Sequence, residues 1–174
     1  MPRPLATLTL ALLSLAVTAA AAPRAPSLLG PPWISIEYPA NPFDRLHRDA
    51  FLYVHTFHHA DAAEASVSAS AEGIVAGARR SVALELRKSS RPGTYSLRRQ
   101  WPAEGTWMLV VRMRAGGGGN GATALVDIGP AGDVTAVRVP STTRDGWVVP
   151  TAVTQRQVEE ALRARVRAEV VRRS

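Results

Sequence analysis

Three of the four histidines of this chain lie in one short stretch, residues 53–59, which reads YVHTFHH. The chain has no cysteine, so a metal site would have to use nitrogen and oxygen donors. Imidazole nitrogen suits both Cu(II) and Zn(II). The candidate metal ligands are therefore His55, His58 and His59, and Asp61 offers a carboxylate oxygen two residues further on.

These three imidazoles converge on one ion only if the chain bends. On an extended strand His55 and His59 share one face, while His58 points to the other. Tyr53 and Phe57 belong to the face of His55, and we expect these two aromatic side chains in or beside the core. A metal site therefore needs the strand to end between His58 and His59.

The fourth histidine, His47, precedes this strand. If the intervening run is extended at ~3.3 Å per residue, His47 lies up to roughly 36 Å from His58 and is a poor fourth ligand. A histidine at a strand edge is also commonly a polar residue that titrates near pH ~6.5 without binding a metal. Metal binding is therefore the alternative interpretation of the stretch rather than the first one.

Enzyme motifs are absent from the sequence. It has no cysteine nucleophile, no Gly-x-Ser-x-Gly elbow, no His-Glu-x-x-His zinc helix and no Asp-x-Asp calcium loop. The glycine-rich run 116–121 is not a phosphate cradle, because an apolar strand-like run rather than a helix follows it. We therefore predict no catalytic residue, and no cofactor apart from the Cu or Zn of the alternative interpretation.

The elements that position the histidines belong to an all-β protein. Short runs of β-branched and aromatic residues recur between turn-forming residues, a pattern typical of an antiparallel sandwich. Within residues 80–88, Val82 and Leu84 alternate with polar or small neighbours, which places the apolar set on a core. Strands are expected over residues 33–38, 50–57, 65–71, 80–88, 95–101, 107–113, 122–128 and 134–139.

The two aromatic-rich strands, 95–101 and 107–113, are expected to form a hairpin. The Pro-Gly pair at 92–93 suits a type II turn before the first strand, and residues 102–105 reverse the chain between the two arms. Aromatic residues in both arms are typical of the cross-strand pairs that stabilise sheets.

The tail of the chain has a different pattern. Residues 141–150, bracketed by two prolines, are expected to be irregular, with Trp147 exposed. Thr154 and Gln157 have the spacing of a capping box, and apolar residues then recur at every fourth position from Val158. This predicts an amphipathic helix of about 17 residues with arginines in its last turn. The pattern leaves open whether the helix docks on the sandwich or meets a partner or a membrane surface.

The N-terminus has the features of a secretory signal peptide: Arg3, an apolar run from Leu5 and small residues at 19–22. We expect cleavage after Ala21 and a periplasmic or secreted location, with an uncleaved membrane anchor as the less favoured alternative. The expected division is residues 1–21 as signal peptide, 22–32 as a flexible N-terminal segment, 33–140 as the sandwich and 141–174 as linker and helix.

The chain is strongly basic, with 21 Lys and Arg against 14 Asp and Glu and a net charge of +7. Six arginines lie in the last 24 residues. Such a balance suits an anionic surface, whereas an exported protein does not meet nucleic acid. The expected partner is an unknown protein or an envelope surface, reached through the basic C-terminal helix.

Residues 92–95, Pro-Gly-Thr-Tyr, and 105–111, Gly-Thr-Trp-Met-Leu-Val-Val, resemble the bacterial periplasmic immunoglobulin-like domains of the YtkA-like, FixH-like and CopC-like groups. The resemblance extends over residues 33–139 and implies a periplasmic sandwich, linked in some members to copper handling or oxidase assembly. CopC-like proteins use an N-terminal histidine as copper ligand, which this chain lacks, and FixH-like proteins keep an N-terminal membrane helix. No functional residue is therefore carried over.

These observations predict an all-β, immunoglobulin-like antiparallel β-sandwich of about seven to eight strands with a C-terminal amphipathic α-helix. The predicted function is that of an exported, non-enzymatic binding or accessory module at the cell envelope. The alternative is a periplasmic Cu- or Zn-binding, metallochaperone-like protein that uses His55, His58 and His59.

Overall fold

The computed structural model describes residues 31–58, 61–114 and 121–173. The predicted signal peptide, His59 and most of the glycine-rich run lie outside these ranges. No helix in the described part of the chain has the length and apolar character needed to cross a bilayer. The elements in chain order are β1 (Trp33–Glu37), β2 (Leu52–His58), β3 (Asp61–Ala62), β4 (Ser66–Val75), β5 (Ala78–Leu84), β6 (Leu86–Lys88), β7 (Thr94–Leu97), β8 (Thr106–Arg114), β9 (Ala122–Ile128), β10 (Val134–Arg138), β11 (Ser141–Arg144), β12 (Trp147–Pro150) and α1 (Gln155–Arg173).

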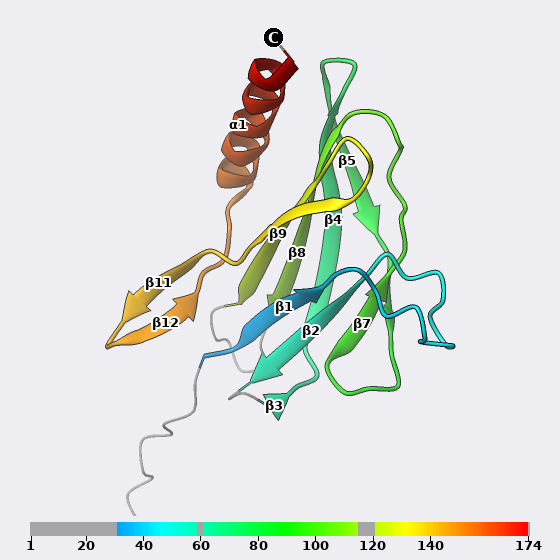
Figure 1. Ribbon diagram of the computed structural model, residues 1–174. Coiled ribbons are helices and arrows are strands. Elements are labelled where there is room, and N and C mark those ends of the chain that lie inside the picture. Colours follow the sequence, from blue (N-terminus) through cyan, green and yellow to red (C-terminus); the bar gives the residue numbers. More distant parts are fainter. Residues whose placement is uncertain (1–30, 59–60, 115–120, 174) are drawn as a thin grey trace, which may run out of the picture.

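Two five-stranded antiparallel sheets, a separate two-stranded sheet and one C-terminal helix make up the described fold, which is all-β with a C-terminal helix as predicted (Figure 1). Sheet A has the strand order β1-β2-β7-β6, with β3 beside β2, and sheet B has the order β10-β9-β8-β4-β5. Leu52 and Val54 of sheet A share a buried cluster with Trp107, Leu109 and Val111 of sheet B. The main core therefore lies between the two sheets.

The outer face of sheet A carries the predicted aromatic face of β2. The rings of Tyr53, His55 and Phe57 follow one another with centroids 6.4 Å apart, which confirms the alternation. Tyr53 is fully buried, yet it is not part of the cluster between the sheets, where Leu52 and Val54 lie. Something on the outer side of sheet A must therefore cover Tyr53.

Twelve strands are described where about seven to eight were predicted. The predicted strand 80–88 is two strands, because the chain leaves sheet B after Leu84 and enters sheet A at Leu86. At this switch the side-chain amide of Gln100 donates to the carbonyl of Glu85 and accepts from its N–H, both at 2.9 Å. The backbone between two ladders is thus satisfied by a side chain. The other additional strands are β3, β11 and β12.

The predicted hairpin of residues 95–101 with 107–113 is wrong, because its two arms belong to different sheets. β7 pairs with β2 and β6, whereas β8 pairs with β4 and β9. Tyr95, Trp101 and Trp107 are all buried in the cluster between the sheets. Aromatic residues that looked like neighbours within one sheet instead meet across the sandwich, where they bury the most apolar area.

The tail contains a helix that packs on sheet B. The predicted capping box is confirmed: the amide of Gln157 accepts from the backbone N–H of Thr154 at 2.9 Å, and Gln157 N–H donates to the Thr154 hydroxyl at 3.3 Å. Val158 and Leu162 are buried against Met108 and other residues on the outer face of sheet B. The first half of the helix is therefore docked on the sandwich, which was one of the two possibilities that the sequence left open.

One arginine of the helix fastens it to the strand ends. Arg165 donates to the carbonyl of Trp107 at 2.5 Å and to that of Ile128 at 2.7 Å, and it lies 3.4 Å from the carboxylate of Asp127. Nearer its C-terminus the helix is more exposed, and Val170 is 63% exposed. The first half of α1 is therefore part of the fold.

Residues 141–150, predicted to be irregular, form the hairpin β11–β12 (Figure 1). Asp145 and Gly146 occupy its turn with φ values of 51° and 80°, as a type I′ turn requires. Trp147 is 53% exposed, as expected. The Asp-Gly pair is the signal that the sequence analysis did not use.

Candidate binding surface on loop 38–51

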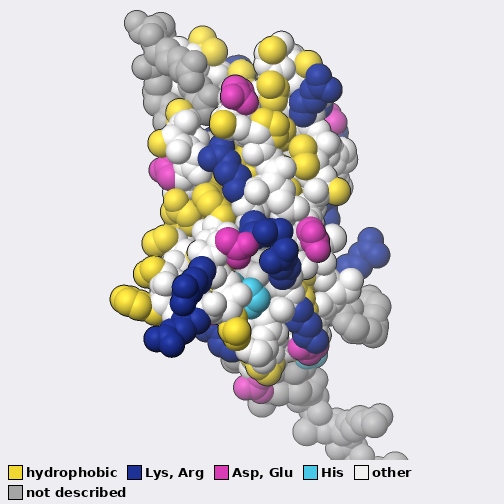
Figure 2. All heavy atoms as spheres, turned by 90° about the vertical axis from the view of Figure 1, so that its right-hand side faces the viewer, with side chains coloured by type: hydrophobic (Ala, Val, Ile, Leu, Met, Phe, Trp, Pro, Cys, Tyr) yellow, Lys and Arg dark blue, Asp and Glu magenta, His cyan; other side chains and the backbone are white. Residues whose placement is uncertain are grey.

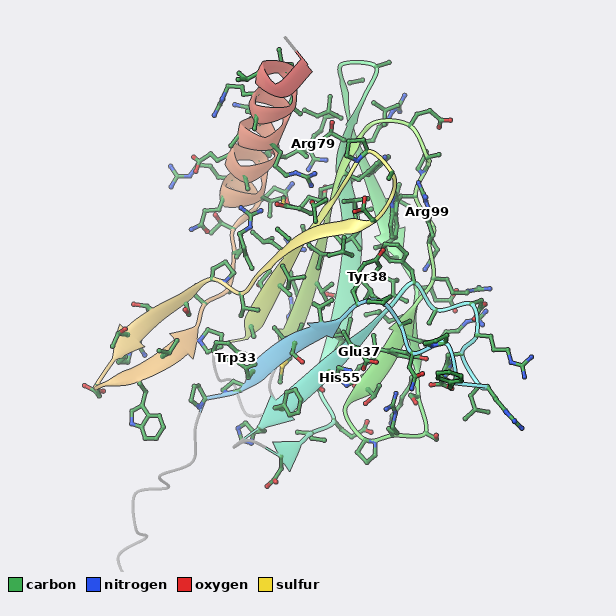
Figure 3. All side chains as sticks on the ribbon, in the orientation of Figure 1. Trp33, Glu37, Tyr38, His55, Arg79 and Arg99 are labelled. Atoms are coloured by element: carbon green, nitrogen blue, oxygen red, sulfur yellow. The ribbon has the colours of Figure 1, made fainter. Side chains whose placement is uncertain are left out.

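Each of the two described histidines of β2 has a different surrounding. His55 Nε2 lies 2.8 Å from Glu37 Oε2 on β1, and Nδ1 lies 3.3 Å from Thr94 Oγ1 on β7. Figure 3 shows His55 and Glu37 next to each other on neighbouring strands. Both ring nitrogens of His55 are engaged, so a metal ion would have to displace Glu37 or share the site with it.

His58 ends β2, and the chain returns as β3 with Asp61 opposite His58. The strand therefore ends where the metal hypothesis needs it to end. Within residues 31–58, 61–114 and 121–173 no three His, Asp or Glu side chains are arranged to hold a metal ion. Because His59 lies outside these ranges, the site formed by His55, His58 and His59 stays a prediction.

The element that covers Tyr53 is the connection between β1 and β2, residues 38–51 (Figure 1). This loop is a series of turns. The amide of Asp44 donates to the carbonyl of Asn41 at 3.1 Å, that of Leu46 to the carboxylate of Asp44 at 3.0 Å, and that of Ala50 to the carbonyl of His47 at 2.9 Å. Asn41, Asp44 and His47 thus recur every third residue, and each starts a turn.

Asp44 fastens the loop to the outer face of sheet A. Its carboxylate accepts a hydrogen bond of 2.8 Å from the Tyr53 hydroxyl. The Arg91 guanidinium lies over the Tyr53 ring, 5.5 Å from its centroid, and 3.8 Å from the same carboxylate. The buried phenol therefore has both an acceptor and a stacked cation, and the loop has a charged anchor.

Two further contacts hold the second half of the loop. His47 Nδ1 lies 3.2 Å from the hydroxyl of Ser96 on β7. Arg98 forms an ion pair of 3.0 Å with Asp49. His47, predicted to lie far from the strand histidines, is thus folded back onto sheet A, and its ring lies 6.2 Å from that of Tyr53. The turns of the connection bring His47 beside Tyr53, and its expected separation from His58 stays a prediction.

The pKa values of Tyr53 and Asp44 are shifted in opposite directions by their contact. Burial and the bond to Asp44 raise the pKa of Tyr53 to about 12. The same bond, together with backbone N–H groups of the loop, holds the pKa of Asp44 below its ordinary value. Across the neutral range a protonated phenol therefore donates to an ionised carboxylate.

Four side chains between the two halves of the loop are exposed to solvent. Phe43 is 87% exposed and Leu46 is 73% exposed. Arg45 and Arg48 are exposed beside them, and neither has an ion pair within the described parts of the chain. Figure 2 shows basic and hydrophobic side chains next to one another on the face from which this loop projects. We call Phe43, Arg45, Leu46 and Arg48 the loop patch.

Neither the loop patch nor its anchors were predicted from the sequence. One signal was present, because the run from 38 to 51 lacks strand alternation and connections longer than about 12 residues are uncommon unless they are functional. A second was the spacing of Asn41 and Asp44, which suits successive side-chain-capped turns. That Asp44 and His47 face the sheet while Phe43 and Leu46 face water could not be read from either signal.

Searches of this chain against protein-family models, curated proteins and solved structures found no match. The resemblance of residues 92–111 to periplasmic immunoglobulin-like domains stays a prediction. We therefore infer a function from loop 38–51 and the residues that hold it on sheet A.

Proposed function

We propose that this protein is an exported, non-enzymatic binding or accessory module of the cell envelope, and that loop 38–51 is its recognition element. The observation that carries the proposal is that some side chains of the loop contact sheet A while others are exposed to solvent. Asp44 and His47 bind sheet A, while Phe43 and Leu46 stand in water. Large apolar side chains gathered on an exposed loop mark interaction sites, and binding loops are typically held by a rigid scaffold.

A hydrolase is the enzyme class that the neighbouring side chains most resemble, since Ser96 and His47 are within hydrogen-bonding distance. Ser96 is buried, and its hydroxyl also lies 3.3 Å from the carbonyl of Arg87. The nearby carboxylate of Asp44 is taken up by Tyr53 and Arg91. A nucleophile needs access to substrate and an oriented base, so this arrangement favours binding over catalysis.

The alternative function, a Cu- or Zn-binding protein, has one observation in its favour. Glu37 and His55 already place an oxygen and a nitrogen donor 2.8 Å apart on the outer face of sheet A. Zinc sites generally need at least three protein ligands, so His58 or His59 would have to complete the set.

Site-specific photo-crosslinking in intact cells tests the main proposal. We expect a photoreactive residue in place of Phe43 to give a defined adduct on illumination, because Phe43 is the more exposed of the two apolar side chains of the loop patch. The matched control carries the same residue in place of Val137, which is 42% exposed on β10 in the other sheet. Equal labelling from both positions, or none from position 43, would reject loop 38–51 as the recognition element.

A further inference from the structure

We propose that the loop patch docks on an anionic membrane surface, with Phe43 and Leu46 in the headgroup region and Arg45 and Arg48 against lipid phosphates. This inference rests on the proposed function, because it names the partner that loop 38–51 recognises. It uses the loop rather than helix α1, whose apolar residues Val158 and Leu162 are already buried against sheet B.

The exposed charge of the loop is positive. Both acids of the loop are bound to basic or phenolic groups: Asp44 to Tyr53 and Arg91, and Asp49 to Arg98. The basic residues of the loop patch have no such partner within the described residues. The outward surface is therefore apolar and cationic, which is the combination that binds anionic lipid.

Hydrogen bonds within the loop and to sheet A hold Phe43 and Leu46 in their exposed positions. Phe43 and Leu46 each follow the first residue of a turn by two positions, and their amides donate to the side chains of Asn41 and Asp44 at 2.9 and 3.0 Å. The anchoring of Asp44 to Tyr53 keeps the two apolar side chains from folding back onto sheet A. The loop therefore loses little conformational entropy when these two side chains leave water.

The small size of the loop patch favours a membrane over a protein as its partner. A stable protein interface buries about 800 Å² on each side and has a well-packed centre. The loop patch offers only two large apolar side chains, on a projecting loop. A fluid headgroup region adapts its shape to a small protrusion, so it needs no complementary surface.

Co-sedimentation of the exported form of the protein with vesicles tests the inference. The vesicles contain either phosphatidylcholine alone or phosphatidylcholine with phosphatidylglycerol. We expect binding to the anionic vesicles that weakens as salt is added. F43S/L46S should reduce the partition coefficient at least about tenfold, because two apolar side chains no longer leave water. R45Q/R48Q should reduce it about 30-fold on anionic vesicles and leave neutral vesicles unaffected.

The matched control is V137S/V148S, which removes two exposed aliphatic side chains of 42% and 54% exposure outside the loop. It should bind as the unchanged protein does. Every variant has the same N-terminus, so the comparison reports the loop patch alone. Equal binding by F43S/L46S and the unchanged protein would overturn the inference, as would a lack of binding to anionic vesicles.

The photo-crosslinking experiment keeps the two proposals apart. If vesicle binding fails and position 43 still forms a specific adduct with a protein in cells, the membrane inference is rejected and the loop remains a recognition element for a protein partner. If both experiments fail, both proposals are rejected.

Discussion

The hydroxyl of Tyr53 donates a hydrogen bond of 2.8 Å to the carboxylate of Asp44, and this contact joins loop 38–51 to the strand that it covers. Arg91 lies over the same ring. The contact therefore fastens the middle of the loop, beside the loop patch, to β2.

Removing this hydrogen bond should free the loop. We expect Tyr53→Phe to cost about 1–3 kcal/mol of unfolding free energy, since the buried Tyr53 side chain loses its hydrogen bond to a charged group. Trypsin should then cleave after Arg45 or Arg48 faster than in the unchanged protein. Tyr38→Phe is the matched control, because Tyr38 is more than a third exposed. Unchanged cleavage rates in Tyr53→Phe would show that other contacts hold the loop.

The same pair makes stability depend on pH at both ends of the scale. The folded pKa of Tyr53, about 12, is above its unfolded value of about 10. Its contribution is therefore complete below pH ~10 and is lost as the pH rises to ~12. The folded pKa of Asp44 is lowered, so its contribution is present above pH ~3.9 and is lost as the pH falls below it.

Denaturant titrations across pH, on the unchanged protein and on Tyr53→Phe, measure this dependence. The stability difference between the two proteins should shrink above pH ~10 and again in acid. Near-ultraviolet absorbance should also show a phenol that ionises near pH 12 in the unchanged protein and is missing in Tyr53→Phe. A constant stability difference at all pH values would contradict the assigned pKa directions.

The metal-binding alternative predicts that the unchanged protein binds one Cu(II) or Zn(II), and that His55→Ala/His59→Ala weakens the binding. Isothermal titration of protein purified without an affinity tag measures both. Under the proposed binding function the two proteins bind metal equally weakly, because His55 is held by Glu37 and Thr94. Equal weak binding would therefore reject the metal site.

Helix α1 should contribute strongly to folding. We expect Leu162→Ala to cost roughly 2–5 kcal/mol, because Leu162 is buried against Met108 and Val110. Val171→Ala is the matched control on the same helix and should change stability by less than about 0.5 kcal/mol, since Val171 is exposed. Thermal unfolding followed by circular dichroism measures both. Similar effects of the two substitutions would mean that the helix does not pack as described.

Gly73 should tolerate no side chain. A Cβ atom there would collide with the indole of Trp107, which packs directly over the β4 backbone. We expect Gly73→Ala to cost about 1–3 kcal/mol. Gly77→Ala is the comparison for sterics, because a Cβ there meets no atom within 4 Å, although its φ of 76° adds backbone strain. If Gly73→Ala lowers the free energy of unfolding less than Gly77→Ala does, the Trp107 indole can shift to make room for the methyl group.

Much of the fold could be predicted because local patterns report local structure. The strands expected at residues 122–128 and 134–139 from apolar runs between turn residues are present as β9 and β10, and the two do pair. The Thr154 to Gln157 spacing marked the start of α1. These features depend on neighbours within four residues or across one turn, so a single chain segment carries the information.

The pairing of distant strands was harder to predict. Residues 95–101 and 107–113 have the same apolar phase whether they lie side by side or across a sandwich, and the structure places them in different sheets. Met108 and Val110 have the parity of an exposed face in that pattern, yet both are buried because α1 covers them. Periodicity cannot report a partner that comes from another part of the chain.

By itself the sequence determined that this is an all-β chain with a capped C-terminal helix, and that Tyr53, His55 and Phe57 share one strand face. Only the tertiary structure decided what that face contacts. It brought Asp44 and His47 back over β2 and left Phe43 and Leu46 in water. The physical reason is that strand alternation follows from backbone geometry alone, whereas burial depends on which distant loop supplies a partner for each polar group.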